Sequence, residues 1–204
     1  MHRRSLLLGA LAPAALSTPA LATQRTAPAL RRLTLRHAAT GARFNGVYHD
    51  GRTVDPKALA DISAVLADSR SGTVHAYDPT VIDILWEAGQ RARWRGEFLV
   101  VSGFRTPETN ALVCGAGNSQ HLSARALDVC LPAAQLTGFA DVALGMRRGG
   151  VGVYASKSFV HLDSGPVRRW GDVPGGPSGG SAPAAPPPDP IARIAEAWAA
   201  TRRP

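Results

Sequence analysis

The stretch between Val173 and Pro190 sets the strongest limit on what this chain can fold into. Nearly every residue in it is Gly, Pro, Ser or Ala. A segment of that composition buries too little apolar surface to offset the loss of chain entropy, so residues 173–204 are predicted to form a Pro/Gly-rich disordered tail. A short terminal helix within that tail is compatible with the helical spacing of four apolar residues, Ile191, Ile194, Ala195 and Trp198.

The N-terminal 22 residues limit the fold from the other side. Two arginines at positions 3 and 4 precede an apolar run from Leu6 to Leu16, and Ala20-Leu21-Ala22 follows as a small-x-small cleavage site. This layout predicts a removable signal peptide, because the apolar run is too short and too interrupted to span a membrane. The arginine pair also resembles a twin-arginine export signal, and an ordinary secretory signal with two arginines is the alternative.

These limits leave residues 23–30 as a linker and residues 31–172 as one folded domain. The composition, 45% hydrophobic and 19% charged, is ordinary for a globular protein. The formal net charge is +8, and it falls to +6 when the signal peptide is removed. A basic charge suits an exported protein that meets an anionic wall polymer, although general solubility explains it equally well. We expect a monomer without a membrane span and without a nucleic-acid partner.

Helices and strands alternate along the domain without a strict βαβ repeat. Apolar periodicity with Asp-Pro or Pro at the start predicts helices at 56–68, 79–93, 107–115 and 132–148. Alternating or continuous apolar runs predict strands at 32–37, 42–48, 97–101, 126–131, 151–154 and 158–163. We therefore predict an α+β fold with a small central antiparallel sheet flanked by helices.

Two of the predicted strands carry chemically active side chains. His161 and Asp163 are two residues apart in a strand, so both point to one face while Val160 and Leu162 point to the other. Asp128 lies within another apolar strand, where an unpaired carboxylate would be costly. Such groups need a charged partner or a metal, and a buried His–Asp hydrogen-bond pair is the simpler alternative.

The order of these motifs resembles a known clan of enzymes. Ser119-x-His121-x4-Ala126-x-Asp128, followed by Phe159-x-His161-x-Asp163, is similar to the zinc peptidases related to D-alanyl-D-alanine peptidases. That clan also includes lysostaphin-type enzymes and the hedgehog signalling domain. Three further segments narrow the resemblance to murein endopeptidases of the MepK (YcbK) type over about residues 30–171: Ser102–Asn110, Gly149–Tyr154 and Val167–Trp170.

The resemblance implies a site and an activity. His121, Asp128 and His161 match the family's zinc ligands, and three protein ligands with an open fourth position suit a catalytic zinc ion. Arg105 matches an arginine expected to hold the substrate carbonyl as negative charge develops, and a structural ion pair is its alternative role. The implied function is a periplasmic zinc peptidase that hydrolyses the peptide cross-links of peptidoglycan, with muropeptides as its partner. A carboxypeptidase that trims muropeptides and a non-catalytic zinc-containing wall-binding module are the alternatives.

The sequence departs from the pattern of this clan at two positions. Ala124 stands where the family usually has Gly, and a positive φ there would strain it. Related enzymes place a Glu or a His shortly before the last ligand, where this chain has Ser158 and Phe159. Asp163 is therefore our candidate for the general base or, alternatively, for a residue that orients a ligand.

The remaining cysteines and histidines carry no motif. Cys114 and Cys130 bracket the first ligand segment, and in an oxidising compartment they either form a disulfide or remain separate thiols. His37, His49 and His75 are expected at the surface or in loops.

Overall fold

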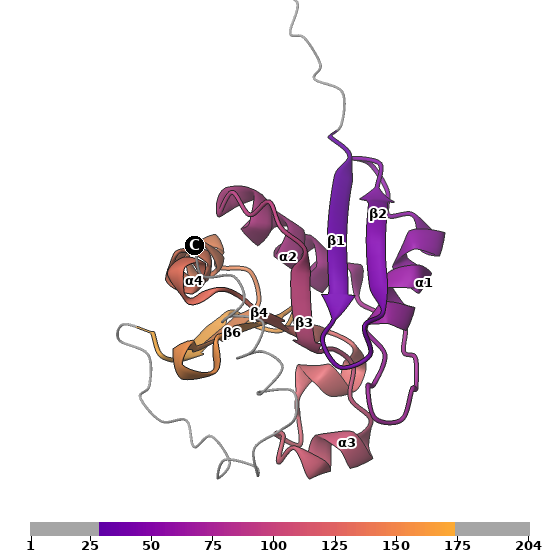
Figure 1. The fold of residues 1–204 in the computed structure, drawn as a ribbon, viewed down its shortest axis with the longest axis vertical. Coiled ribbons are helices and arrows are strands. Elements are labelled where there is room, and N and C mark those ends of the chain that lie inside the picture. The colour runs from indigo at the N-terminus through magenta and orange to yellow at the C-terminus, as the bar shows by residue number, and fades with distance from the viewer. Residues whose placement is uncertain (1–28, 174–204) are drawn as a thin grey trace, which may run out of the picture.

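A computed structural model of the protein describes residues 29–173 (Figure 1). The assigned signal peptide, most of the linker and nearly all of the tail lie outside these residues. In chain order the elements are β1 (Arg31–His37), β2 (Arg43–His49), α1 (Pro56–Val65), α2 (Pro79–Arg91), β3 (Phe98–Ser102), α3 (Pro107–Leu112), the 3-10 turn η1 (Gln120–Ser123), β4 (Ala126–Cys130), α4 (Ala133–Met146), β5 (Gly150–Tyr154), the 3-10 turn η2 (Ala155–Lys157), β6 (Phe159–Asp163) and β7 (Arg168–Gly171).

The helix starts follow the local chemistry of the sequence. Asp55, Asp78 and Thr106 each precede a proline at the first helical position. The side chain of Asp55 accepts two backbone N–H groups of the first turn, and those of Asp78 and Thr106 accept one each. The predicted helices are confirmed, and each of the four ends two or three residues earlier than the sequence predicted. Within the described residues no helix is long and apolar enough to cross a membrane.

The predicted α+β fold is confirmed, but the sheet is mixed and not purely antiparallel as expected. Its seven strands run in the order β2-β1-β3-β4-β6-β5-β7. β1 and β3 are parallel, because the segment between them includes two helices and brings the chain back to the same end of the sheet. The other neighbours pair antiparallel, except for β5 and β7.

Strand β7 was not predicted, because its four residues are too short and too polar to show a strand pattern. The chain turns after Asp163, passes the start of β5 and runs parallel to it at the edge of the sheet. This edge strand places Trp170 opposite Gly152, with β5 and β6 between it and β4.

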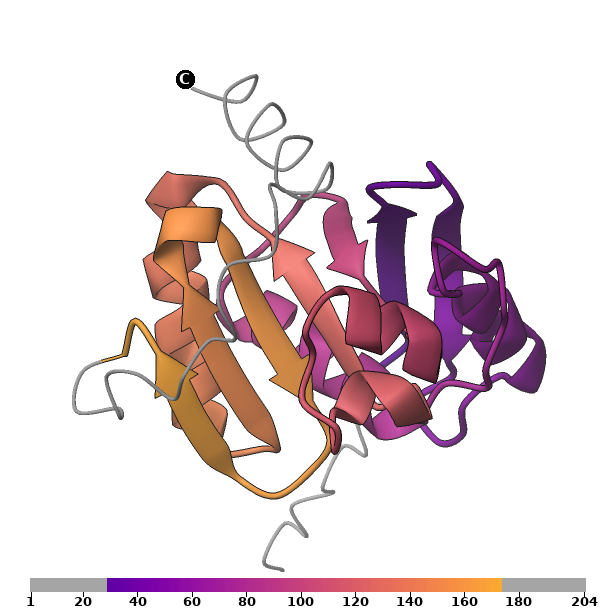
Figure 2. The same ribbon diagram turned by 90° about the horizontal axis from the view of Figure 1, so that it is seen from below.

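Strand alternation gives the sheet two different faces. On one face Leu127, Val129, Val160 and Leu162 join the buried apolar core, which also includes residues of α2 and α4. Figure 2 shows α4 behind strands β4 to β6, and α3 and η1 in front of them. Asp128, His161 and Asp163 alternate with those core residues and therefore occupy the opposite face.

Candidate metal centre

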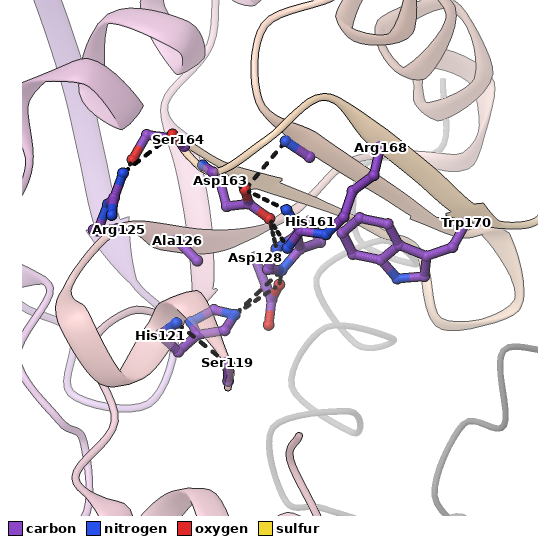
Figure 3. A network of polar contacts seen from close by, with 12 residues as sticks. Ser119, His121, Arg125, Ala126, Asp128, His161, Asp163, Ser164, Arg168 and Trp170 are labelled. Atoms are coloured by element: carbon purple, nitrogen blue, oxygen red, sulfur yellow. Dashed lines mark hydrogen bonds and ion pairs between the residues drawn. The ribbon is translucent and has the colours of Figure 1, made fainter. Parts of the chain in front are cut away.

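The three predicted ligands meet on the face of the sheet away from the apolar core. Asp128 in β4 and His161 in β6 are direct cross-strand partners. His121 approaches from η1, which lies next to β4 (Figure 3). All three side chains are buried, with residue exposures of 2%, 6% and 8% for His121, Asp128 and His161. The two separate sequence motifs therefore form one site.

Three ligand atoms converge within this cluster. His161 Nδ1 lies 2.8 Å from Asp128 Oδ1 and 3.2 Å from His121 Nε2. His121 Nε2 lies 3.4 Å from the same Asp128 oxygen. Metal–ligand distances of 2.0–2.1 Å in a tetrahedral zinc site separate neighbouring ligand atoms by about 3.3 Å. The spacing therefore fits one small cation with a tetrahedral preference.

The opposite nitrogen of each imidazole has its own acceptor. His121 Nδ1 donates to the carbonyl oxygen of Gly103 at 2.7 Å. His161 Nε2 donates to Asp163 Oδ2 at 3.0 Å. These bonds fix the tautomers, so that His121 presents the lone pair of Nε2 and His161 that of Nδ1 toward Asp128. Two lone pairs and a carboxylate oxygen point to one place, and a cation there would satisfy all three.

The electrostatics of the cluster agree with a cation site. Burial lowers the pKa of His121, which favours the neutral ring that binds metals. Burial raises the pKa of Asp128, but the adjacent His121 and His161 outweigh it and hold this pKa well below its usual range. Burial lowers the pKa of His161, yet hydrogen bonds to Asp128 and Asp163 outweigh it and raise this pKa overall. A proton on His161 would thus occupy the place that a metal ion would take.

Arg105 lies beside the site and forms an ion pair with Asp128. Its Nη2 donates to Asp128 Oδ2 at 2.9 Å and its Nε to Ser102 Oγ at 2.8 Å. The guanidinium therefore binds the carboxylate oxygen that does not face the two histidines. A guanidinium has five N–H donors, and the bonds to Asp128 and Ser102 use two of them.

Asp163 lies on the side of the His161 ring that faces away from His121 (Figure 3). It is completely buried. Arg168 donates to both of its oxygens, at 2.7 and 3.1 Å, and the backbone N–H groups of Gly150 and Gly165 also donate to it. Every contact of this carboxylate holds it behind the ligand ring.

The loop that carries Arg105 is fixed by Asp68, which the sequence analysis did not select. Asp68 is 1% exposed. One of its carboxylate oxygens accepts from the N–H of Thr106 at 2.7 Å, and the other accepts from those of Arg70 and Ser71. Phe104 N–H also donates to Leu66 O at 2.9 Å. The sequence after Asp68 is typical of a turn. The other partner of this carboxylate, Thr106, lies 38 residues later in the chain, so the sequence did not indicate that the two residues meet.

Ala124 occupies the left-handed region, with φ of 50° and ψ of 39°. This is the conformation in which Ala is strained relative to Gly, by about 1 kcal/mol. The residue ends η1, and its N–H donates to the carbonyl of His121. The strain is therefore located one turn from a ligand.

An aromatic group borders the ligands on the β5–β7 side. Trp170 packs against His161, with ring centroids 5.1 Å apart, and its Nε1 donates to the hydroxyl of Tyr154 at 2.7 Å. The indole lies across Gly152, where a Cβ atom would come within 2.5 Å of Trp170 Cε2. Trp170 belongs to the Val167–Trp170 segment of the family resemblance, but nothing in its sequence indicated that it borders the site.

Among residues 29–173, the other histidines and the cysteines take no part in the cluster. His37 and His49 are buried, contrary to the prediction. Each ends a strand, and its Nδ1 accepts a backbone N–H of the turn that follows, so the buried nitrogen has a hydrogen-bond partner. His75 is exposed, as predicted. Cys114 is exposed and Cys130 is buried in β4, and no disulfide joins them in the described part of the chain.

Comparison with known proteins identifies the family. The family model described as peptidoglycan L,D-endopeptidase MepK matches residues 25–170. This chain belongs to the MepK family. It is 35% identical over 176 residues to the peptidoglycan L,D-endopeptidase MepK of Escherichia coli K12, covering 83% of this chain and 96% of the relative.

A second MepK-family relative agrees. The probable peptidoglycan L,D-endopeptidase MepK of Haemophilus influenzae is 32% identical over 152 residues, covering 72% of this chain and 82% of the relative. No solved structure matches the chain. The MepK-type resemblance drawn from the motifs is thus confirmed at the level of the family.

Proposed function

We propose that this chain is an exported zinc peptidase that hydrolyses peptide cross-links of peptidoglycan. One observation carries the proposal: Asp128 Oδ1, His121 Nε2 and His161 Nδ1 converge, with both rings held in the tautomer that leaves these nitrogens free to bind a metal. Membership of the MepK family, whose relatives are named peptidoglycan L,D-endopeptidases, supports the substrate class. The first bond to test is a cross-linking amide bond between an amino acid of L configuration and one of D configuration.

Zinc is the metal that suits this donor set best. Two imidazoles and one carboxylate are ligands of catalytic zinc, and three protein ligands leave a position for water or substrate. Bound there, zinc would supply an acidified water and polarise the scissile carbonyl. Magnesium and calcium prefer sites built from oxygen alone, and the two histidines disfavour them.

The residues around the ligands would keep the site in one geometry. The Gly103 carbonyl orients His121, Asp163 orients His161, and Arg105 holds Asp128 so that Oδ1 faces the histidines. Such partners typically change metal affinity by about 10- to 100-fold. The N–H groups of Arg105 that Asp128 and Ser102 do not use would bind the carbonyl oxygen of the substrate as charge develops there.

Asp163 is proposed as an orienting residue rather than as the general base. Burial raises its pKa, but the hydrogen bond and charge of His161, the N–H of Gly165 and the charge of Arg168 together bring it down to about 2. A carboxylate that is so weakly basic and so fully bonded is poorly suited to accept a proton from water. Its contacts favour the second of the two roles that the sequence left open.

Export is proposed on the sequence of residues 1–22, which lie outside the described residues. A signal peptide of either the twin-arginine or the ordinary secretory type would deliver the chain to the periplasm, where peptidoglycan is accessible. Without the two arginines of the signal peptide the chain keeps a basic net charge of +6, which fits a polymer that carries carboxylates.

The test is digestion of purified sacculi by the zinc-loaded protein, with and without a chelator, followed by identification of the muropeptides. We expect the cross-linked dimers to disappear, and we expect the chelator to prevent this loss. Release of terminal amino acids alone would show a carboxypeptidase. Binding to sacculi without any release would show a non-catalytic module.

The ligand assignment has its own measurement. His161→Ala should lose both bound zinc and hydrolysis, because it removes one of three ligands. Asp141→Ala, an exposed position on α4, should retain both. An unchanged zinc content of His161→Ala in elemental analysis would overturn the assignment.

A further inference from the structure

We propose that Tyr154 is a further catalytic residue, whose hydroxyl donates a hydrogen bond to the carbonyl oxygen of the scissile amide. This proposal rests on the proposed function, because it places Tyr154 against the substrate of that site. It addresses a gap in the sequence, since positions 158 and 159 are Ser and Phe and offer no charged or imidazole group beside the last ligand.

The register of the sheet places Tyr154 on the same face as the ligands. Gly152 is the cross-strand partner of His161, and Tyr154 is two residues further along β5. Side chains two residues apart in a strand share a face. The Tyr154 ring stacks on Phe159, with centroids 4.5 Å apart, and Phe159 is two residues before His161 in β6. Tyr154 therefore lies on the metal side of the sheet.

Trp170 fixes the hydroxyl group. The indole packs against the ring of His161 and donates its only N–H to the Tyr154 oxygen at 2.7 Å. The Tyr154 oxygen is thus an acceptor in this bond, and its own proton remains for another partner. In the described part of the chain no acceptor for that proton is found, and the side chain is half-buried rather than enclosed. A donor held in one position and left without an acceptor is ready for a ligand.

The charges of the site act on this hydroxyl. Burial raises the pKa of Tyr154, the bond from Trp170 lowers it, the charge of Asp128 raises it and that of Arg105 lowers it. The net pKa lies above its ordinary value, so the phenol remains a proton donor at neutral pH. Both Asp128 and Arg105 belong to the metal centre, so Tyr154 is within electrostatic range of the reacting groups.

A neutral donor at this position has a defined chemical use. When water adds to an amide carbonyl, the oxygen gains negative charge, and a donor fixed beforehand stabilises that charge more than it stabilises the substrate. Trp170, Phe159 and the Tyr154 ring present apolar surface around the hydroxyl, which strengthens such a bond by excluding water. Arg105, already bonded to Asp128, would act on the same oxygen from the β3–β4 side.

The test compares Tyr154→Phe with Tyr48→Phe in the zinc-loaded protein acting on a cross-linked muropeptide. Tyr154→Phe keeps the stacking on Phe159 and removes only the hydroxyl. We expect kcat to fall by about 100-fold with KM and zinc content unchanged. Tyr48→Phe is the matched control, because its hydroxyl donates to Asp83 at 2.7 Å, away from the metal centre.

A second variant and a binding measurement complete the test. Trp170→Phe keeps an aromatic ring but frees the Tyr154 hydroxyl, and it should lower kcat by about tenfold and less than additively with Tyr154→Phe. A phosphinate analogue of the muropeptide mimics the charged tetrahedral state, and Tyr154→Phe should weaken its binding while leaving the affinity for the reaction product unchanged.

The outcomes separate this proposal from the function on which it rests. A wild-type protein that does not cleave muropeptides overturns both. If the wild type cleaves them and Tyr154→Phe keeps its kcat and its phosphinate affinity, only the role of Tyr154 is overturned. Equal losses of phosphinate and product affinity would also overturn it, because they would show uniform binding.

Discussion

His161 Nε2 lies 3.0 Å from Asp163 Oδ2, and the same carboxylate oxygen accepts from Arg168 Nη2 at 2.7 Å. The other ring nitrogen of His161 faces Asp128. Asp163 is therefore connected to the candidate metal centre through the imidazole, and its oxygens already accept hydrogen bonds from fixed donors.

Asp163→Asn should weaken zinc binding by about 10- to 100-fold, because an amide pairs less well with Arg168 and holds His161 less firmly. Turnover at saturating zinc should stay close to that of the wild type. Zinc affinity and zinc-saturated kcat, measured on the same preparation, check both statements. A loss of about 100-fold in kcat that excess zinc does not restore would instead assign proton transfer to Asp163.

The contribution of Asp163 to stability should depend on pH in a defined direction. Its pKa in the folded protein is about 2, below the ordinary value of 3.8. A carboxyl with a depressed folded pKa stabilises the fold fully above its unfolded pKa, and the stabilisation is lost as the pH falls through the folded value. The difference in unfolding free energy between wild type and Asp163→Asn should therefore shrink from about pH 4 downward. It should also shrink as the pH rises through the raised folded pKa of His161, because the charged imidazole is the main partner of this carboxylate.

Denaturant unfolding of the metal-free protein at a series of pH values measures this difference. Subtracting the variant from the wild type removes the effect of the other carboxylates that are common to both. A difference that stays constant down to about pH 2 would contradict the assigned pKa.

Asp68→Asn should weaken the metal centre from a distance. An amide oxygen replaces only one of the two acceptors that join the turn at Arg70 to Thr106, so the loop bearing Gly103 and Arg105 loses an anchor. We expect a loss of stability of about 1–3 kcal/mol and a lower zinc affinity, because Gly103 O orients His121.

Asp50→Asn is the matched control for that variant. Asp50 also accepts two backbone N–H groups of its own turn, those of Arg52 and Thr53, but it has no role in the Arg105 loop. Asp68→Asn should have a lower melting temperature and a lower zinc affinity than Asp50→Asn, as measured by thermal unfolding and zinc titration. Equal zinc affinity in Asp68→Asn and the wild type would reduce Asp68 to a purely structural role.

Gly152→Ala should disturb the aromatic border of the site. The added Cβ would lie 2.5 Å from Trp170 Cε2, so the indole must move away from His161 and Tyr154. We expect a loss of about 1–3 kcal/mol in stability together with a lower kcat. Gly138→Ala in α4 is the control, since nothing lies within 4 Å of its added Cβ and helix propensity favours Ala. Wild-type turnover in Gly152→Ala would show that the indole position is unimportant.

The sequence alone determined the features that depend on near neighbours in the chain. Asp55, Asp78 and Thr106 capped helices as their side-chain chemistry requires, and strand alternation put His161 and Asp163 on one face. The motifs also selected the three residues that converge, and the family comparison agrees with the resemblance they carry. The helix caps, the strand alternation and the motifs are all local features, because each depends only on the spacing of residues within one short segment.

Only the tertiary structure decided how these residues work. Which nitrogen of each histidine faces Asp128 depends on Gly103 and Asp163, and the anchoring of Arg105 depends on Asp68 in a distant turn. The parallel strand β7, which brings Trp170 to Tyr154, was likewise invisible in its short polar sequence. The reason is physical: the role of a buried polar group is set by the partner that satisfies it, and that partner comes from whichever segment the fold places within hydrogen-bond distance.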